Sequence, residues 1–309
     1  MKKKQGLLLP VSAICLTTLI WGVSFVSIKV AVEVLPPMSL AFSRFIIASL
    51  LLRLLLWKRE PGFRLTRKNV FPLILSGLVG VTLYFFFENN GVKLISPSTS
   101  SIIIAGIPIV TVLVDTLLFG APVTLPKIAG VVLSFAGVYL VVEHGLSMAG
   151  APLLGYLFMF GAVLTWVIYN FLTRPLFGRY SQLAIVCYQT IFGTIAFIPM
   201  ILFEIGTIEW SRVTPLIVLN VLYLGVLCSA LGYSFYLYAL KHLGVGTTTL
   251  FINLIPVVTV ASSALMLRER ISLKQVLGGL LVVLAVSLVS LRRVRRGESR
   301  KQRRSGTRS

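Results

Sequence analysis

Apolar residues along the chain fall into long uninterrupted runs, and charged residues, prolines or glycines separate one run from the next. About 20 helical residues cross about 30 Å of hydrocarbon, which is the length that identifies a membrane-spanning helix. Runs of about this length occur at residues 7–32, 38–57, 71–92, 97–119, 127–142, 152–172, 183–203, 215–240, 246–267 and 274–291. The pattern predicts an all-α integral membrane protein with ten transmembrane helices.

Composition supports a membrane protein. The chain is 57% hydrophobic and 12% charged, with a mean hydropathy of +0.94, which is too apolar for a typical soluble domain. The net charge of +20 would suggest nucleic acid in a soluble protein. Here the cations stand at the ends of apolar runs, where they set orientation in the membrane. We therefore expect the chain to contact membrane lipid and not to bind nucleic acid.

The distribution of Lys and Arg between alternate loops predicts the orientation. One side of the membrane receives only Lys93, Arg212, Arg268, Arg270 and Lys274, and the other receives all remaining loop and terminal cations. Because cytoplasmic loops carry the excess of cations, both termini are predicted to be cytoplasmic in the cell membrane. The basic tail 292–309 is expected to be disordered and to lie at the anionic lipid surface, with nucleic-acid or partner binding as the alternative.

An internal repeat divides the chain. A shift of 148 positions superimposes Lys93, Pro108, Thr111 and Gly130 on identical residues, and a shift of 145 places Trp21 on Trp166. The predicted units are a first repeat at 1–143, a connecting loop at 144–151, a second repeat at 152–291 and the tail. Each repeat holds five predicted helices. An odd number makes the second copy enter the membrane from the opposite side, which predicts two inverted five-helix halves, as in many secondary transporters. The alternative is that the duplication only stabilises a bundle.

Several segments resemble a known family. They are Trp21-Gly22 with Lys29, Arg44-Phe45, ENNGVKLISPSTSSIIIAGIPIVTVLV from Glu88, YALKHLGVGTTTLFINLIPVVTV from Tyr238, and LRERIS. The chain resembles the drug/metabolite transporter superfamily, specifically the bacterial EamA-type transporters, over residues 7–291. This resemblance implies a secondary carrier of two five-helix repeats, but none of the segments reports the substrate. The family usually carries an acidic residue after the fourth and the ninth helix. Glu269 stands at the position after the ninth helix, whereas Ala121 stands at the position after the fourth.

Charged residues inside apolar runs cost a few kcal/mol each and need a reason. Arg44 and Glu88 are predicted to lie at similar depth, so we expect them to form an ion pair. The alternative is that Glu88 titrates, or that Arg44 meets a substrate carboxylate. Asp115 is predicted to be an interfacial carboxylate or a proton site, and Lys29 a helix-end cation that extends toward water.

Other candidates are polar or aromatic. Asn89 and Asn253 are amides within apolar runs, whose usual role is to bond a neighbouring helix. Pro108 and Pro256 are expected to kink their helices beside a central cavity. The predicted substrate-binding residues are Trp21, Phe25, Arg44, Tyr84, Glu88, Asn89, Trp166 and Asn253. The predicted coupling or gating residues are Glu88, Pro108, Asp115 and Pro256.

Catalytic and cofactor motifs are absent from the sequence. It contains no GxxxxGK[ST] phosphate loop, its two histidines stand near loops, and its three cysteines lie within apolar runs without metal-ligand spacing. We expect no enzyme activity, no cofactor and no metal. The leading hypothesis is an exporter of small metabolites such as amino acids or amphipathic compounds, with proton coupling left open. The alternatives are an importer of a sugar or nucleoside, and a non-transporting membrane partner protein. A homodimer also stays open.

Overall fold

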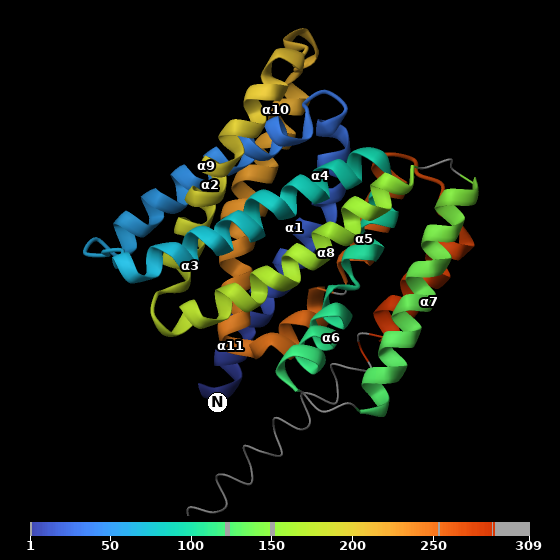
Figure 1. The fold of residues 1–309 in the computed structure, drawn as a ribbon, viewed down its shortest axis with the longest axis horizontal. Helices are drawn as coiled ribbons and strands as arrows, with labels where there is room; N and C mark the ends of the chain where they lie inside the picture. Colours follow the sequence, from blue (N-terminus) through green and yellow to red (C-terminus); the bar gives the residue numbers. More distant parts are fainter. Residues whose placement is uncertain (1, 121–123, 149–151, 253, 286, 288–309) are drawn as a thin grey trace, which may run out of the picture.

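The computed structural model describes residues 2–120, 124–148, 152–252, 254–285 and 287, and within these residues the regular structure is helical (Figure 1). The first repeat contains α1 (Lys2–Val32), α2 (Pro37–Arg59), α3 (Arg67–Gly77), α4 (Tyr84–Leu94), α5 (Pro97–Ile104), α6 (Ile107–Phe119) and α7 (Leu125–Met148). The second contains α8 (Leu153–Thr173), α9 (Gln182–Glu204), α10 (Pro215–Leu222), α11 (Tyr233–Ile252) and α12 (Ile255–Met266). A further apolar helix, Leu273–Ala285, follows α12.

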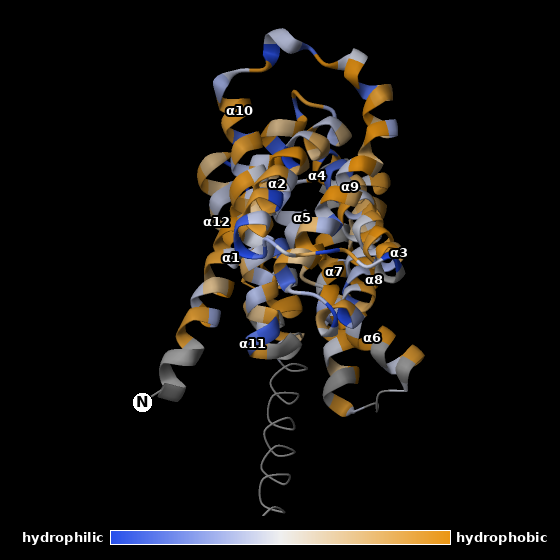
Figure 2. Ribbon diagram, turned by 90° about the vertical axis from the view of Figure 1, so that its left-hand side faces the viewer, coloured by the Kyte–Doolittle hydropathy of each residue, from blue (hydrophilic) through white to orange (hydrophobic). Residues whose placement is uncertain are grey.

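Seven helical stretches of the described chain are long and apolar enough to cross a membrane: Leu8–Val32, Pro37–Arg59, Val70–Leu94, Pro97–Leu118, Leu153–Gly178, Gln182–Thr207 and Pro215–Leu243. Three shorter apolar helices, Ile128–Val141, Ile255–Met266 and Leu273–Ala285, coincide with parts of the fifth, ninth and tenth predicted runs. Large apolar side chains such as Leu50, Phe203 and Leu219 are exposed. Figure 2 shows hydrophobic residues along most of the helices. The protein is therefore a multi-pass membrane protein, and the count of ten spanning helices stays a prediction.

One predicted helix boundary is wrong. The sequence suggested a loop between the eighth and ninth runs at residues 241–245, but α11 continues through it to Ile252. Gly244 and Gly246 lower helix propensity without removing a hydrogen-bond donor, so they do not end the helix. The interruption falls just before Pro256, whose ring and missing N–H oppose a continuous helix.

The two proline interruptions have the same local structure. Between α5 and α6 the N–H of Gly106 donates to the carbonyl of Ile103 at 2.9 Å, and between α11 and α12 the N–H of Leu254 donates to Phe251 at 3.0 Å. The two bonds are 148 positions apart in the chain. The repeat seen in the sequence is therefore also a repeat of backbone geometry.

Two π-helical segments also recur at equivalent places. Leu78–Leu83 joins α3 to α4, and Tyr223–Gly232 joins α10 to α11. Such segments widen a helix locally and are frequent at functional sites. They place residues of the third and eighth predicted helices at the centre of the bundle.

A glycine just before the first π segment and another within the second allow the two repeats to approach closely. A Cβ on Gly77 would stand 2.5 Å from the carbonyl oxygen of Gln189, and a Cβ on Gly225 would stand 2.9 Å from that of Arg44. Gly77 and Gly225 are one repeat apart, and so are Arg44 and Gln189. The second helix of each repeat therefore packs against the equivalent glycine of the other repeat.

The other helices show the same reciprocal packing between the two repeats. α1 packs against α11 and α12 of the second repeat, and α8 packs against α4, α5 and α6 of the first, while α2 and α9 pack against each other. α7 and the helix Leu273–Ala285 lie together at one edge (Figure 1). Gly137 and Gly278 face each other there, since a Cβ on either would stand 2.6 Å from the other's carbonyl oxygen.

Candidate substrate-binding pocket

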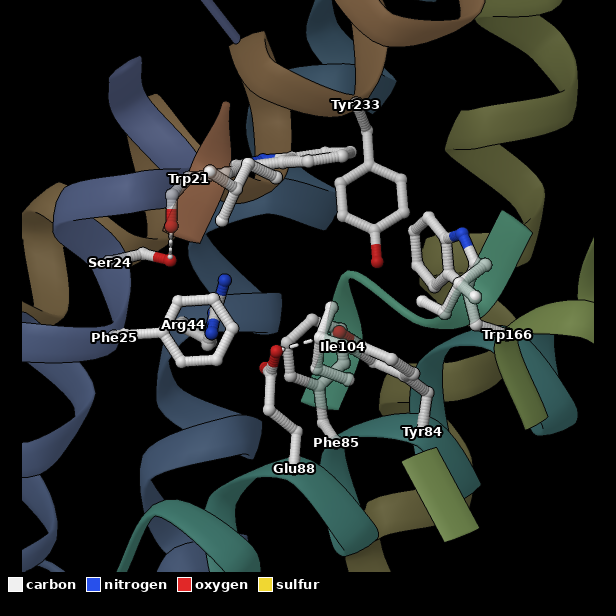
Figure 3. Close-up of a pocket in the computed structure, with 12 residues that line it drawn as sticks. Trp21, Ser24, Phe25, Arg44, Tyr84, Phe85, Glu88, Ile104, Trp166 and Tyr233 are labelled. Carbon is white, nitrogen blue, oxygen red and sulfur yellow. Dashed lines mark hydrogen bonds between the residues drawn. The ribbon is translucent and has the colours of Figure 1, made fainter. Parts of the chain in front are cut away.

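A pocket lies where the two repeats meet, and its walls come from α1, α2, α4, α5, α6, α8, α11 and α12 (Figure 3). It holds about 490 Å³ of space not filled by atoms, its opening included. The lining residues are Trp21, Ser24, Phe25, Arg44, Tyr84, Phe85, Glu88, Ile104, Ile107, Trp166, Tyr233 and Ile255. Three pairs within this set are one repeat apart: Trp21 with Trp166, Phe85 with Tyr233, and Ile107 with Ile255.

Aromatic rings form one wall of the pocket. The rings of Trp21 and Trp166 meet edge to face with centroids 6.0 Å apart, and Tyr233 lies 5.4 Å from Trp21 and 5.8 Å from Trp166. Tyr84 lies 4.8 Å from Trp166. The indole N–H of Trp21 donates to the carbonyl of Cys228 at 3.0 Å, within the second π segment. These contacts hold the rings in fixed positions around the pocket.

Arg44 brings a cation into this wall. Its side chain is 2% exposed, its Nε donates to the hydroxyl of Ser229 at 3.0 Å, and its guanidinium carbon lies 4.5 Å from the ring centroid of Phe85. Its Nη1 is buried and has no hydrogen-bond partner. A stacked and singly bonded guanidinium has donors left for another group.

Glu88 brings an anion from α4. Its side chain is 5% exposed, and its Oε1 accepts a hydrogen bond of 2.7 Å from the hydroxyl of Tyr84, one helical turn earlier. Arg44 and Glu88 thus line the same pocket, which agrees with the similar depths predicted for them. However, no salt bridge joins them within 4.0 Å in the described structure. The predicted ion pair is wrong here. Arg44 bonds to Ser229 instead, and Glu88 bonds to Tyr84.

Six of the predicted substrate-binding residues line the pocket: Trp21, Phe25, Arg44, Tyr84, Glu88 and Trp166. Asn89 does not. Its amide donates to the carbonyl of Pro37 at 2.9 Å and joins α4 to the start of α2, which is the packing role usual for amides in membranes. The prediction that Asn89 binds substrate is therefore not supported, because the side chain bonds the backbone instead. Asn253 lies outside the described residues.

The predicted coupling residues behave differently from one another. Pro108 and Pro256 do not line the pocket, but the isoleucine that precedes each of them does. Asp115 lies in α6, and its side chain is not among those described. Ile107 and Ile255 thus line the pocket at the two helix interruptions, on equivalent helices of the two repeats.

Six lining residues were not among the predicted substrate-binding residues: Ser24, Phe85, Ile104, Ile107, Tyr233 and Ile255. The repeat carried a usable signal for four of them, because Phe85 with Tyr233 and Ile107 with Ile255 are aligned pairs beside predicted site residues. Ser24 stands three residues after Trp21, on the same helical face. Ile104 carried no signal, since one isoleucine among many in an apolar run is not distinctive.

Polar contacts tie the repeats together at one end of the bundle. Glu204, at the end of α9, accepts from the backbone N–H groups of Met38 and Ser39 in the first turn of α2, at 3.2 and 2.7 Å. Glu269 accepts from the hydroxyls of Ser98 and Ser263. A carboxylate at a helix N-terminus satisfies free N–H groups and the helix dipole. These contacts join α2 and α5 of the first repeat to the second.

Lys29 lies at the same end of the first repeat. Its Nζ donates to the carbonyls of Val92, Lys93 and Ile95 at 3.0, 2.9 and 3.3 Å, where α4 ends. A cation stabilises the carbonyl end of a helix. Lys29 is therefore a helix-end cation, as predicted, but the helix end that it caps belongs to α4.

Comparison with known proteins gives the family. The EamA-like transporter family model matches residues 8–143 and again residues 153–291. The chain belongs to the EamA-like transporter family. It is 31% identical to an uncharacterized transporter of Archaeoglobus fulgidus over 94% of this chain and 98% of that protein. This EamA-family chain contains two copies of the family unit, and the family and its named relatives are transporters.

One further relative and one solved structure extend the comparison. A probable terminal-alkyne amino-acid exporter of Streptantibioticus cattleyicolor is 28% identical over 91% of this chain and 93% of that protein. A solved crystal structure of a protein superimposes with a TM-score of 0.64 at 21% identity, covering 93% of this chain and 98% of the other. The structural likeness shows a shared fold and nothing of the substrate.

Proposed function

We propose that this protein is a secondary transporter that exports small amino-acid-like metabolites from the cell. Its pocket carries the proposal. Among the twelve described lining residues Arg44 is the one cation and Glu88 the one anion, and neither is paired with the other. A zwitterion presents one charge of each sign, so it can complement both groups while the aromatic wall covers its apolar part. A multivalent anion would need further cations.

The name of the Streptantibioticus relative supports the amino-acid class, since that protein is called an amino-acid exporter. One other feature of the pocket agrees with a small amphipathic solute, because half of its lining residues are aromatic and can cover an apolar side chain. The direction of transport and the class of solute both remain part of the proposal.

We infer that transport uses alternating access of two inverted five-helix halves. The reciprocal packing of Gly77 on Gln189 and Gly225 on Arg44 supports an exchange of roles between the halves. Two halves with the same contacts can adopt an outward-open and an inward-open state by rocking about a central site. We place both termini in the cytoplasm and the protein in the cell membrane, following the excess of cations on one side. Proton coupling through Glu88 is part of the same proposal.

The experiment is uptake into proteoliposomes that contain the purified protein. Vesicles loaded with an unlabelled amino acid should take up the same labelled amino acid by counterflow, for at least one member of the twenty common L-amino acids. Protein-free vesicles and vesicles with the Arg44→Gln variant are the controls. Counterflow of nucleosides or sugars, with none for any amino acid, would contradict the proposed substrate class.

A further inference from the structure

Two hydrogen-bond donors in the pocket have no partner. Arg44 Nη1 and the hydroxyl of Tyr233 are both buried, and neither makes a hydrogen bond. Buried polar groups are almost always bonded, and an unmade bond to a buried group carries a free-energy penalty. Both residues line the same pocket. Figure 3 shows the Tyr233 hydroxyl and the Arg44 side chain directed into the same space, with Glu88 below them. Two orphaned donors facing one space indicate a ligand that accepts hydrogen bonds.

Neighbouring side chains fix both donors in place. Ser229 holds Arg44 through its Nε, and the rings of Phe85 and Phe45 lie 4.5 and 5.2 Å from the guanidinium carbon. Tyr233 packs between the two tryptophans of the aromatic wall. A pre-organised donor loses little side-chain entropy when it binds its acceptor. Both donors are therefore held in fixed positions, and each lacks only a hydrogen-bond acceptor.

We propose that Arg44 Nη1 and the Tyr233 hydroxyl together bind the carboxylate of the transported solute, and that Glu88 receives its ammonium group. This inference rests on the proposed function and assigns its substrate-binding atoms. A carboxylate offers two oxygens, one for each donor, and a charge that suits the guanidinium. A carboxamide of the same shape offers one oxygen and no charge, so it satisfies this pair of donors poorly.

The two donors belong to different repeats. Arg44 stands on α2 of the first repeat, and Tyr233 begins α11 of the second, directly after the π segment that carries Ser229. A carboxylate bound by both would join the repeats at the centre of the bundle. Tyr233 is then a specificity-determining residue that acts on the acid group, and Ser229 is a positioning residue for Arg44.

Binding to purified protein tests the assignment. The probes are the twenty common L-amino acids, each with its carboxamide, and the readout is the apparent affinity from thermal-shift titrations, since a ligand raises the stability of the state that it binds. We expect at least one acid to bind and its carboxamide to bind at least tenfold more weakly. Tyr233→Phe should weaken the acid about tenfold, the size expected for one lost bond to a charged group, and should leave the carboxamide nearly unaffected.

Tyr236→Phe is the matched control, because Tyr236 lies one turn away in the same aromatic cluster, 5.3 Å from Trp21, and is not a lining residue. It should bind the acid as the wild type does. Ser229→Ala should weaken the acid less than Arg44→Gln does. Equal affinity for acid and carboxamide, equal affinity of Tyr233→Phe and wild type, or binding of no amino acid at all would each overturn the assignment.

Flux measurements separate this inference from the proposed function. If acid and carboxamide are transported equally well in proteoliposomes, the carboxylate site is wrong and the transporter stands. If the acid binds as expected but no solute crosses the membrane, the site stands and the transport function is wrong.

Discussion

Trp21 and Trp166 occupy equivalent positions in the two repeats, and their rings meet edge to face with centroids 6.0 Å apart. The duplication thus brings its own equivalent residues together at the pocket. The environments of the two indoles are nevertheless different. Trp21 donates its N–H to the carbonyl of Cys228, in a π segment of the other repeat.

This difference predicts unequal effects of the same substitution. Trp21→Phe removes both ring area and the bond to Cys228, which leaves a buried carbonyl short of one donor. We expect Trp21→Phe to lower the free energy of unfolding by about 1 to 2 kcal/mol more than Trp166→Phe. Unfolding of the two purified variants in a denaturing detergent, followed by circular dichroism, gives the comparison. Equal losses would show that the bond contributes nothing.

Glycine packing between the repeats gives a second prediction. Gly225→Ala and Gly77→Ala place a methyl group against the backbone of Arg44 and Gln189, and should each destabilise the protein by about 1 to 3 kcal/mol. Gly279→Ala is the control, because its nearest neighbour, Ile102, would be 3.5 Å from the new Cβ. That change should be neutral or slightly stabilising, since alanine favours the helix. If all three variants melt alike, the close approach has no energetic role.

Glu88 provides the third prediction. If Glu88 exchanges a proton during transport, Glu88→Gln should slow uptake at least tenfold and remove the dependence of uptake on external pH. Tyr84→Phe keeps the carboxylate and removes its 2.7 Å hydrogen bond, so uptake should keep a pH dependence with a displaced midpoint. Initial rates across pH 5 to 9 in proteoliposomes provide the test. Unchanged rates with an unchanged pH profile in Glu88→Gln would remove Glu88 from the mechanism.

The contacts of Glu204 and Glu269 lead to the fourth prediction. By the predicted orientation they close the extracellular end, so replacing both with glutamine should favour opening to the outside. A single cysteine introduced at Ser24, which lines the pocket, reports this when the native cysteines are replaced. Labelling by a membrane-impermeant maleimide added outside cells should become several-fold faster. Glu209→Gln, which changes an exposed carboxylate, is the control, and slower or unchanged labelling in the double variant would argue against an extracellular closure.

Much of the fold followed from local patterns that act over one turn or one span. Run lengths located the helices, and a fixed shift in the sequence located the repeat. The extent of α11 was mispredicted because two glycines suggested a loop that the backbone did not need, whereas Pro256 decided where the break fell. The π segments carry no comparable signature in the chain, so the widening that places Ser229 beside Arg44 could not be foreseen.

The site was predictable where depth and repetition constrained it. Arg44 and Glu88 were placed in one pocket by counting residues from the helix ends, and Trp21 with Trp166 by the repeat. Pairing was not predictable, because it depends on which neighbour lies within hydrogen-bond distance. Ser229 and Tyr84 are such neighbours, and they form hydrogen bonds with Arg44 and Glu88. The place of Asn89 was not predictable for the same reason, since its amide donates to a backbone carbonyl and the residue does not line the pocket.

The central claim is that the pocket between the repeats is the transport site, and counterflow through a protein with a disabled pocket tests it most directly. The double variant Arg44→Gln/Glu88→Gln should reconstitute as a folded protein, judged by its circular dichroism and gel filtration, and should show no counterflow of the amino acid that the wild type carries. Counterflow at the wild-type rate in this variant would place the transport site elsewhere and contradict the account.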